Sequence, residues 1–162
     1  MASASRSISR LILLLGAGLC LAVPASAQQV QVLKEVPYAP QSGASDSVKR
    51  ECELHRKIPE SLAAAISDLQ VVDKFGGGRR LELLIRDVHA PPAGAFSGPK
   101  WLTLHGTLKS GGKEVGSFRA KRTTVFGAGT CGMLFKCVNA IADDVSEWLK
   151  SPTRDARLGN AN

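Results

Sequence analysis

Aromatic residues are scarce in this chain. They make up 5% of its 162 residues, with two Trp, one Tyr and five Phe. No run of them alternates with basic residues, as a surface that stacks nucleic-acid bases requires. The scarcity therefore argues against a nucleic-acid partner, and we predict none.

Known catalytic motifs are also missing. The sequence has no G-x-S-x-G, which presents a nucleophilic serine, and no H-E-x-x-H, which holds zinc on a helix. The adjacent acids Asp143 and Asp144 would point about 100° apart on a helix, which suits a solvated face better than paired acid–base work. We therefore predict that the chain is not an enzyme and uses no cofactor and no metal.

A long apolar run is absent as well. The apolar segment 11–23 falls short of the about 20 residues that a membrane-spanning helix needs. It follows Arg6 and Arg10, with no acid before it, and it precedes Ala25-Ser26-Ala27. This pattern is typical of a cleavable secretory signal peptide. We expect residues 1–27 to be removed and the mature chain to be periplasmic or secreted, without stable membrane insertion.

The signal changes how the remaining sequence is interpreted. Cys20 follows Leu19, whereas a lipid-bearing cysteine follows a small residue, so we expect no lipid anchor. Removing 27 residues leaves 135, enough for one domain. The net charge falls from +7 to +5 because Arg6 and Arg10 leave. This modest excess favours another envelope protein or an anionic cell-surface polymer as the partner.

The first part of the mature chain changes from a strand pattern to a helical one. Val30, Val32 and Val36 predict a short strand within residues 28–37, and residues 38–47 predict a loop. Apolar residues then recur every three or four positions over residues 48–69, the spacing of one helical face. Pro59 fits best in a first turn, so we place the body of this helix at residues 58–68.

Alternating apolar and polar residues predict strands at 70–73, 80–90, 101–108 and 114–125. In the second of these, Val88 is expected on the face opposite Leu81, and Thr103 in the third is expected to point outward. A helix is predicted at residues 131–149. The fold class is therefore α+β, a two-layer sandwich with a mostly antiparallel sheet of 4–5 strands covered by two helices, in the order β-α-β-β-β-β-α.

The same reading divides the chain by role. After the signal peptide, residues 28–50 are expected to form an N-terminal strand and loop, and residues 51–150 the α+β core domain. The polar residues 151–162 are expected to form a flexible tail.

Three cysteines remain after export, namely Cys52, Cys131 and Cys137. An oxidising compartment favours a disulfide, and the odd number leaves one thiol over. If Cys131 and Cys137 are both helical, their Cα atoms lie about 9 Å apart, beyond disulfide reach. We therefore favour a bond that involves Cys52, with its partner left open. The alternatives are a zinc site that includes Cys52-x-x-His55 and a reactive free thiol at Cys131.

Residues 127–132 match G-x-G-x-x-G, the dinucleotide-binding pattern. The preceding strand is charged, and no parallel strand is expected after the following helix, so a dinucleotide site is disfavoured. We predict a turn whose helix is capped by Thr130. An anion site at this helix N-terminus is the alternative. Its residues would be Gly127, Gly129, Thr130, Arg119, Lys121 and Arg122. His89 and His105 are expected to be surface or edge residues.

In their order, these segments resemble small exported domains related to the curli secretion-pore lipoprotein and to the outer-membrane lipoproteins that activate peptidoglycan synthases. The resemblance covers about residues 30–150. Its segments are QVQVL, ESLAAAI, LQVVD, LELLIRDV, WLTLHGTL, VGSFRAKR and IADDVSEWLKSP. It implies a module for envelope assembly or partner binding. This chain differs by lacking the lipid-bearing cysteine and by carrying Cys52, Cys131 and Cys137, and no functional residue can be carried over.

The signal peptide generates a prediction about the exported protein. Its intact mass is expected to correspond to residues 28–162, without a lipid and with one disulfide, because the signal is cleaved and the compartment is oxidising. Mass spectrometry of the protein, reduced and unreduced, measures all three properties. A mass that includes residues 1–27 or an acyl chain would contradict the prediction.

Overall fold

The computed structural model describes residues 29–91 and 98–161, and the predicted signal peptide lies outside them. Strands and helices follow one another along the described chain. Their bounds are β1 Val30–Leu33, α1 Asp46–Cys52, α2 Leu54–Ala65, β2 Leu69–Val72, β3 Arg79–His89, β4 Lys100–Ser110, β5 Lys113–Thr124, α3 Gly129–Lys150 and β6 Ala156–Gly159.

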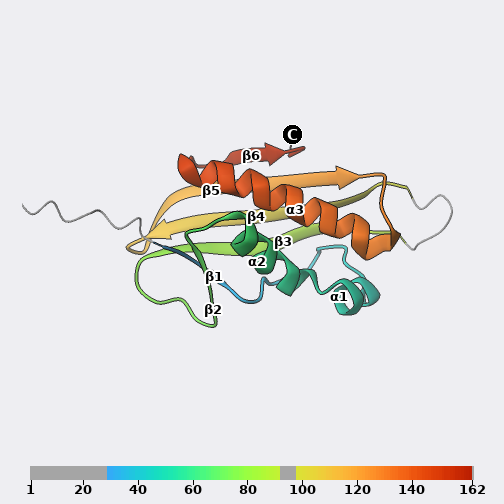
Figure 1. Cartoon of the computed structure of the whole chain (residues 1–162), viewed down its shortest axis with the longest axis horizontal. Helices are drawn as coiled ribbons and strands as arrows, with labels where there is room; N and C mark the ends of the chain where they lie inside the picture. The colour runs from blue at the N-terminus through green and yellow to red at the C-terminus, as the bar shows by residue number, and fades with distance from the viewer. Residues whose placement is uncertain (1–28, 92–97, 162) are drawn as a thin grey trace, which may run out of the picture.

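The strands form one sheet in the order β2-β1-β3-β4-β5-β6. Neighbours β3, β4 and β5 are antiparallel, whereas β1 runs parallel to β2 and β3, and β6 runs parallel to β5. The helices lie on one side of this sheet (Figure 1). The predicted α+β two-layer class is confirmed. The described chain also contains α1 and β6, and its sheet is mixed, with both parallel and antiparallel neighbours.

The core lies between the helices and the facing side of the sheet. Strand residues at alternate positions point into it, as the period of two requires. They include Leu81, Ile85, Leu102, Leu104 and Leu108, each fully buried. The facing stripe of α3 consists of Leu134, Val138, Ile141, Val145 and Trp148. Burying one such aliphatic side chain stabilises the fold by about 1.5–3 kcal/mol, so this layer supplies most of the driving force for folding.

A glycine in the middle of β4 lets an aromatic pair pack in this core. A Cβ atom at Gly106 would lie only 2.3 Å from the Phe118 ring. The Phe118 ring in turn meets the Trp148 ring edge to face, with centroids 4.9 Å apart. Gly106 therefore gives Phe118 the room that it needs beneath α3.

A bulge in β3 changes which residues point inward. The register with β4 shifts between Ile85 and Asp87, so Arg86 is the extra residue. Val88, predicted on the outer face, is consequently turned inward and is 1% exposed. Thr103 is also 1% exposed, although it alternates with the inward-facing Leu102 and Leu104, because it lies between Asp87 and Lys121 in the strand register.

The helical region before β2 differs from the prediction. Instead of one helix over residues 58–68, two helices form, α1 and α2, separated by Glu53 in a left-handed conformation with φ of 43°. The Ser45 side chain caps α1 by accepting from the Val48 amide at 3.3 Å. The predicted loop over residues 38–47 therefore ends in a helix start.

Pro59 was predicted in the first turn of its helix. In the structure it lies further inside, within α2. A proline at this position leaves the carbonyl of the residue four positions earlier without its helical donor. That residue is His55, and its carbonyl accepts a hydrogen bond from the Val36 amide at 2.9 Å. The segment after β1 thus satisfies the group that Pro59 cannot, which is why the helix continues through the proline.

The segment after α3 also differs from the expected flexible tail. Residues Ala156–Gly159 form β6, which pairs with β5 in parallel. Without β6, the backbone groups of residues 118–121 on that side of β5 would be unpaired, and pairing them is favourable. This strand also corrects the expectation that no parallel strand follows the last helix.

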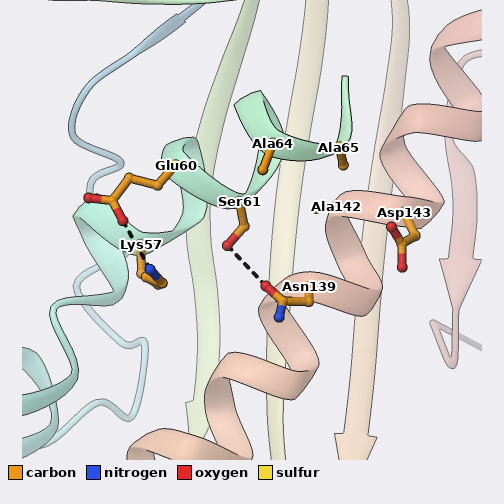
Figure 2. A pocket seen from close by; sticks show the side chains of 8 residues that line it. All are labelled: Lys57, Glu60, Ser61, Ala64, Ala65, Asn139, Ala142 and Asp143. Carbon is orange, nitrogen blue, oxygen red and sulfur yellow. Dashed lines mark hydrogen bonds and ion pairs between the residues drawn. The ribbon is translucent and has the colours of Figure 1, made fainter. Parts of the chain in front are cut away.

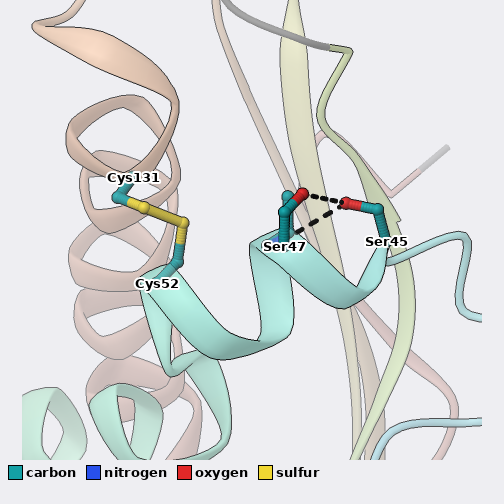
Figure 3. Close-up of a disulfide and its surroundings, with 5 residues drawn as sticks. Ser45, Ser47, Cys52 and Cys131 are labelled. Carbon is teal, nitrogen blue, oxygen red and sulfur yellow. Dashed lines mark hydrogen bonds between the residues drawn. A yellow bond between two sulfur atoms is a disulfide. The ribbon is translucent and has the colours of Figure 1, made fainter.

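A disulfide connects the two helical parts of the chain (Figure 3). Cys52 at the end of α1 is bonded to Cys131 in the first turn of α3, with Cα atoms 5.1 Å apart. The predicted involvement of Cys52 is confirmed, and Cys131 is its partner. Cys137 is the free cysteine, and it is buried.

Loss of this disulfide is expected to lower the free energy of unfolding by about 2–4 kcal/mol, because the bond closes a long loop and restricts the unfolded chain. The test is urea unfolding of a Cys52→Ala, Cys131→Ala double variant beside the wild type. Wild-type protein in reductant is the matched control and should lose the same amount. Equal midpoints with and without the bond would contradict the prediction.

Candidate functional site

The turn before α3 differs from the predicted capped helix start. The helix begins at Gly129, its N-cap is Ala128, and no side chain caps it, so Thr130 lies inside the helix. The turn packs tightly on the helix, because a Cβ atom at Gly127 would lie 2.6 Å from Cγ of Met133. The Thr130 cap is therefore wrong, and the space beside Gly127 is filled by Met133.

The basic residues predicted beside this turn point to opposite sides of the sheet. Arg122 alternates with the inward-facing Phe118 and Ala120 and forms an ion pair with Asp144 of α3, with its Nε 2.8 Å from the carboxylate. This hydrogen bond raises the pKa of Arg122. Arg119 and Lys121 lie between these positions and so point outward.

The structure thus does not bring the six predicted anion-site residues together. Arg122 is occupied by Asp144, and its outward-pointing neighbours on β5 lie across the sheet from the start of α3. Anion binding at the turn stays a prediction, and the structure favours a different grouping of Arg119 and Lys121.

A shallow pocket lies between α2 and α3, on the helical side of the molecule (Figure 2). Its polar groups largely satisfy one another. Ser61 Oγ donates to Asn139 Oδ1 at 3.1 Å, and Lys57 Nζ lies 3.1 Å from Glu60. The remaining wall is mainly alanine, from Ala64, Ala65 and Ala142. This pocket therefore presents few groups for a ligand.

The opposite side of the sheet carries the outward side chains of β3, β4, β5 and β6, and we call it the open face. His105 on β4 pairs directly with Arg119 on β5, and Arg119 pairs with Arg157 on β6. Paired residues on neighbouring strands lie side by side on the same face. The open face therefore contains a transverse row of three basic side chains. Arg86 in the β3 bulge is exposed and its charge acts on His105, so it adds a fourth.

The arginines of this row form no ion pair with the described residues. In the described part of the chain, no carboxylate lies within ion-pair distance of Arg86, Arg119 or Arg157. Burial, followed by the charges of Arg119 and Arg86, lowers the pKa of His105, so this ring is neutral at neutral pH. The arginines therefore supply the positive charge of the row.

The open face also carries an acid, Glu82, whose charge is already compensated. Glu82 lies 2.7 Å from Lys109 Nζ and 3.0 Å from Arg80 Nε. Because these two basic residues compensate its negative charge, Glu82 does not cancel the attraction of the arginine row for an anion.

A second cluster lies beside this row, around Trp101 of β4. The Trp101 Nε1–H donates to Asp87 at 2.6 Å, and the ring of His89 stacks on the indole with centroids 3.7 Å apart. The Nζ of Lys121 lies 5.1 Å from the indole centroid. His89 is exposed, as predicted, whereas His105 lies on a central strand and is partly buried.

The disulfide contradicts the two alternatives for the cysteines, a free thiol at Cys131 and a zinc site at Cys52. Cys131 is held in the disulfide, so the free thiol proposed for it is absent. Cys52 is used by the same bond, which removes it from a zinc site with His55. Within residues 29–91 and 98–161, no cluster of three or more His, Cys, Asp or Glu residues is placed to hold a metal. None of the described helices is long and apolar enough to cross a membrane.

Sequence reasoning identified only part of the open face. Arg119 and Lys121 were singled out, but they were grouped with the wrong neighbours, since the strand register and the path of α3 decide which charges meet. Arg86, Arg157, His89 and Trp101 were not assigned to a site. The alternation of WLTLH in β4 is the one sequence signal that could have placed Trp101 on the outward face.

Cys137 is expected to react slowly with thiol reagents. Its side chain is buried, and this burial raises the pKa of its thiol, so little thiolate is present at neutral pH. Iodoacetamide labelling followed by peptide mass spectrometry should show no label on Cys131 and label on Cys137 mainly after denaturation. The denatured, unreduced protein is the control. Rapid labelling of either cysteine in the native protein would contradict this assignment.

Comparisons with known proteins place the chain in no family. No family model matches it, and no curated protein matches its sequence. Among solved structures, a protein from Xanthomonas campestris has a TM-score of 0.49 at 12% identity, covering 75% of this chain and 83% of that one. The PelC dodecamer from Paraburkholderia phytofirmans has a TM-score of 0.46 at 11% identity, covering 70% and 85%. With TM-scores below 0.5, these similarities assign neither a family nor a function.

Proposed function

We propose that this chain is an exported, non-catalytic module that binds an anionic partner in the cell envelope through its open face. The observation that carries the proposal is the row of Arg86, Arg119 and Arg157 beside His105. These guanidinium groups lie on a rigid sheet and have no carboxylate within ion-pair distance in the described chain. Such a surface attracts anions and can bind carboxylates or phosphates through paired hydrogen bonds.

Two lysines on the helical side differ from the arginine row in a way that supports this assignment. On the helical side, Lys57 and Lys150 are each paired with a glutamate one helical turn away, at Glu60 and Glu147. The charges of these two lysines are thus neutralised locally. Among the described residues, the arginine row on the open face has no such carboxylate, so the negative charge of a bound molecule would complete it.

Export is consistent with this role. The Cys52–Cys131 disulfide fits the oxidising compartment that the signal peptide implies. Outside the cytoplasm, the anionic partners available to such a face are polymers of the envelope and acidic surfaces of other envelope proteins. The absence of a recognised catalytic motif in the sequence favours binding over catalysis.

An Arg86→Gln, Arg119→Gln double variant is expected to bind immobilised polygalacturonate about tenfold more weakly than wild type, since two charges that face the polymer are lost. Raising the salt concentration should weaken wild-type binding, because the contact is electrostatic. Biolayer interferometry over a salt series measures both effects.

The matched control is a Lys57→Gln, Lys150→Gln double variant, which removes the same charge from the helical side. It should bind like wild type. Equal losses in the two variants would show that net charge, and not the open face, drives binding. No binding of wild type to polygalacturonate, polyglutamate or anionic lipid vesicles would overturn the proposed function.

A further inference from the structure

The cluster around Trp101 has the form of a ring-binding platform. Three features hold the indole in place. Its Nε1–H donates to Asp87 at 2.6 Å, and the His89 ring stacks on it at an interplanar angle of 10°. The backbone of Trp101 belongs to the central strand β4. A side chain held in this way loses little conformational freedom when a ligand binds.

The second face of the Trp101 indole is covered by the ammonium group of Lys121. His89 covers one face at 3.7 Å, so the Nζ of Lys121, at 5.1 Å from the centroid, must lie over the other. The pair forms a cation–π contact that a competing anion could replace. A ligand with a carboxylate would draw the ammonium group to itself and gain access to the indole face.

We propose that the open face binds an acidic polysaccharide, with one uronate ring on Trp101 and its carboxylate on Lys121. This inference rests on the proposed anion-binding function of the open face and names its ligand class. The C–H groups on one side of a sugar ring carry partial positive charge, which matches the negative face of the indole. Lys121 supplies the complementary charge for the carboxylate.

The neighbouring row extends this contact along a polymer. Arg119 lies two residues from Lys121 on β5, so both side chains point to the open face about 7 Å apart along the strand. Across the strands, Arg119 and Arg157 are neighbours at the usual separation of about 4.8 Å. Charges repeated at such short steps fit a linear polymer with one carboxylate on each unit.

The arrangement favours a glycan over the other extended polyanions. Single-stranded nucleic acids need successive aromatic platforms for successive bases. On strands β3 to β6, Trp101 is the one Trp, Tyr or Phe that points outward, since Phe118 is buried in the core. An acidic peptide would use the arginines but has no sugar-like ring for the Trp101 platform.

The test compares hexagalacturonate, polyglutamate and oligo-dT as ligands of the mature protein, by titration of tryptophan fluorescence and by calorimetry. Trp148 is 6% exposed, so a change in emission on binding reports Trp101. We expect hexagalacturonate to bind about tenfold more tightly than polyglutamate of equal charge and to change the emission.

Two variants locate the contact. Trp101→Leu should weaken hexagalacturonate binding about tenfold and leave polyglutamate binding unchanged, whereas Arg119→Gln should weaken both ligands. His89→Ala removes an exposed ring from the same stack and is expected to weaken hexagalacturonate about threefold, which keeps the test valid if Trp101→Leu does not fold. Phe126→Ala, at a residue 78% exposed outside β3 to β6, is the control and should change neither affinity.

The outcomes separate this inference from the proposed function. If hexagalacturonate and polyglutamate bind equally, or the Trp101 and His89 variants affect both alike, the sugar-ring contact is overturned while anion binding by the open face stands. Tighter binding of oligo-dT would overturn the glycan in favour of nucleic acid. If none of the three polyanions binds, both proposals fail.

Discussion

Burial of only one face of the sheet is the constraint on which the rest of this structure depends. The apolar stripes of α2 and α3 cover the inward side chains of β3, β4 and β5, and this layer supplies most of the hydrophobic stabilisation. Every strand must therefore keep its register, because a slip of one residue would exchange the two faces. The positions of the outward side chains are consequently fixed by packing that occurs on the other side of the backbone.

This division separates the residues that stabilise the fold from those of the proposed binding face. The guanidinium groups of Arg86, Arg119 and Arg157 contribute little to the core, yet the strands that bear them are held by it. A surface of this kind can keep charge without an ion-pair partner at small cost, since water solvates it. The Trp101 stack adds a rigid apolar element to the same face.

The sequence predicted the regular elements well where packing is simple. Alternation located β3, β4 and β5, and the apolar stripe located α3, because each follows one period without interruption. It failed where distant parts of the chain intervene. The Val36 amide lets α2 continue through Pro59, and β5 orders the polar segment that becomes β6. The bulge at Arg86 likewise depends on pairing with β4.

The same reasoning explains the candidate site. Basic character near Arg119 and Lys121 was visible in the sequence, but the row that they form requires the pairing of β4, β5 and β6. His89 and Trp101 meet because two antiparallel strands place them opposite each other. No local pattern contains that information.

The Cys52–Cys131 bond has a consequence for resistance to proteolysis. It links the end of α1 to the start of α3, so α2 and strands β2 to β5 lie within the closed covalent loop. A protease that cuts the backbone once anywhere between these two cysteines releases no fragment. The nicked protein remains one molecule whose pieces stay at high effective concentration, and the sheet can persist through damage that would divide an open chain.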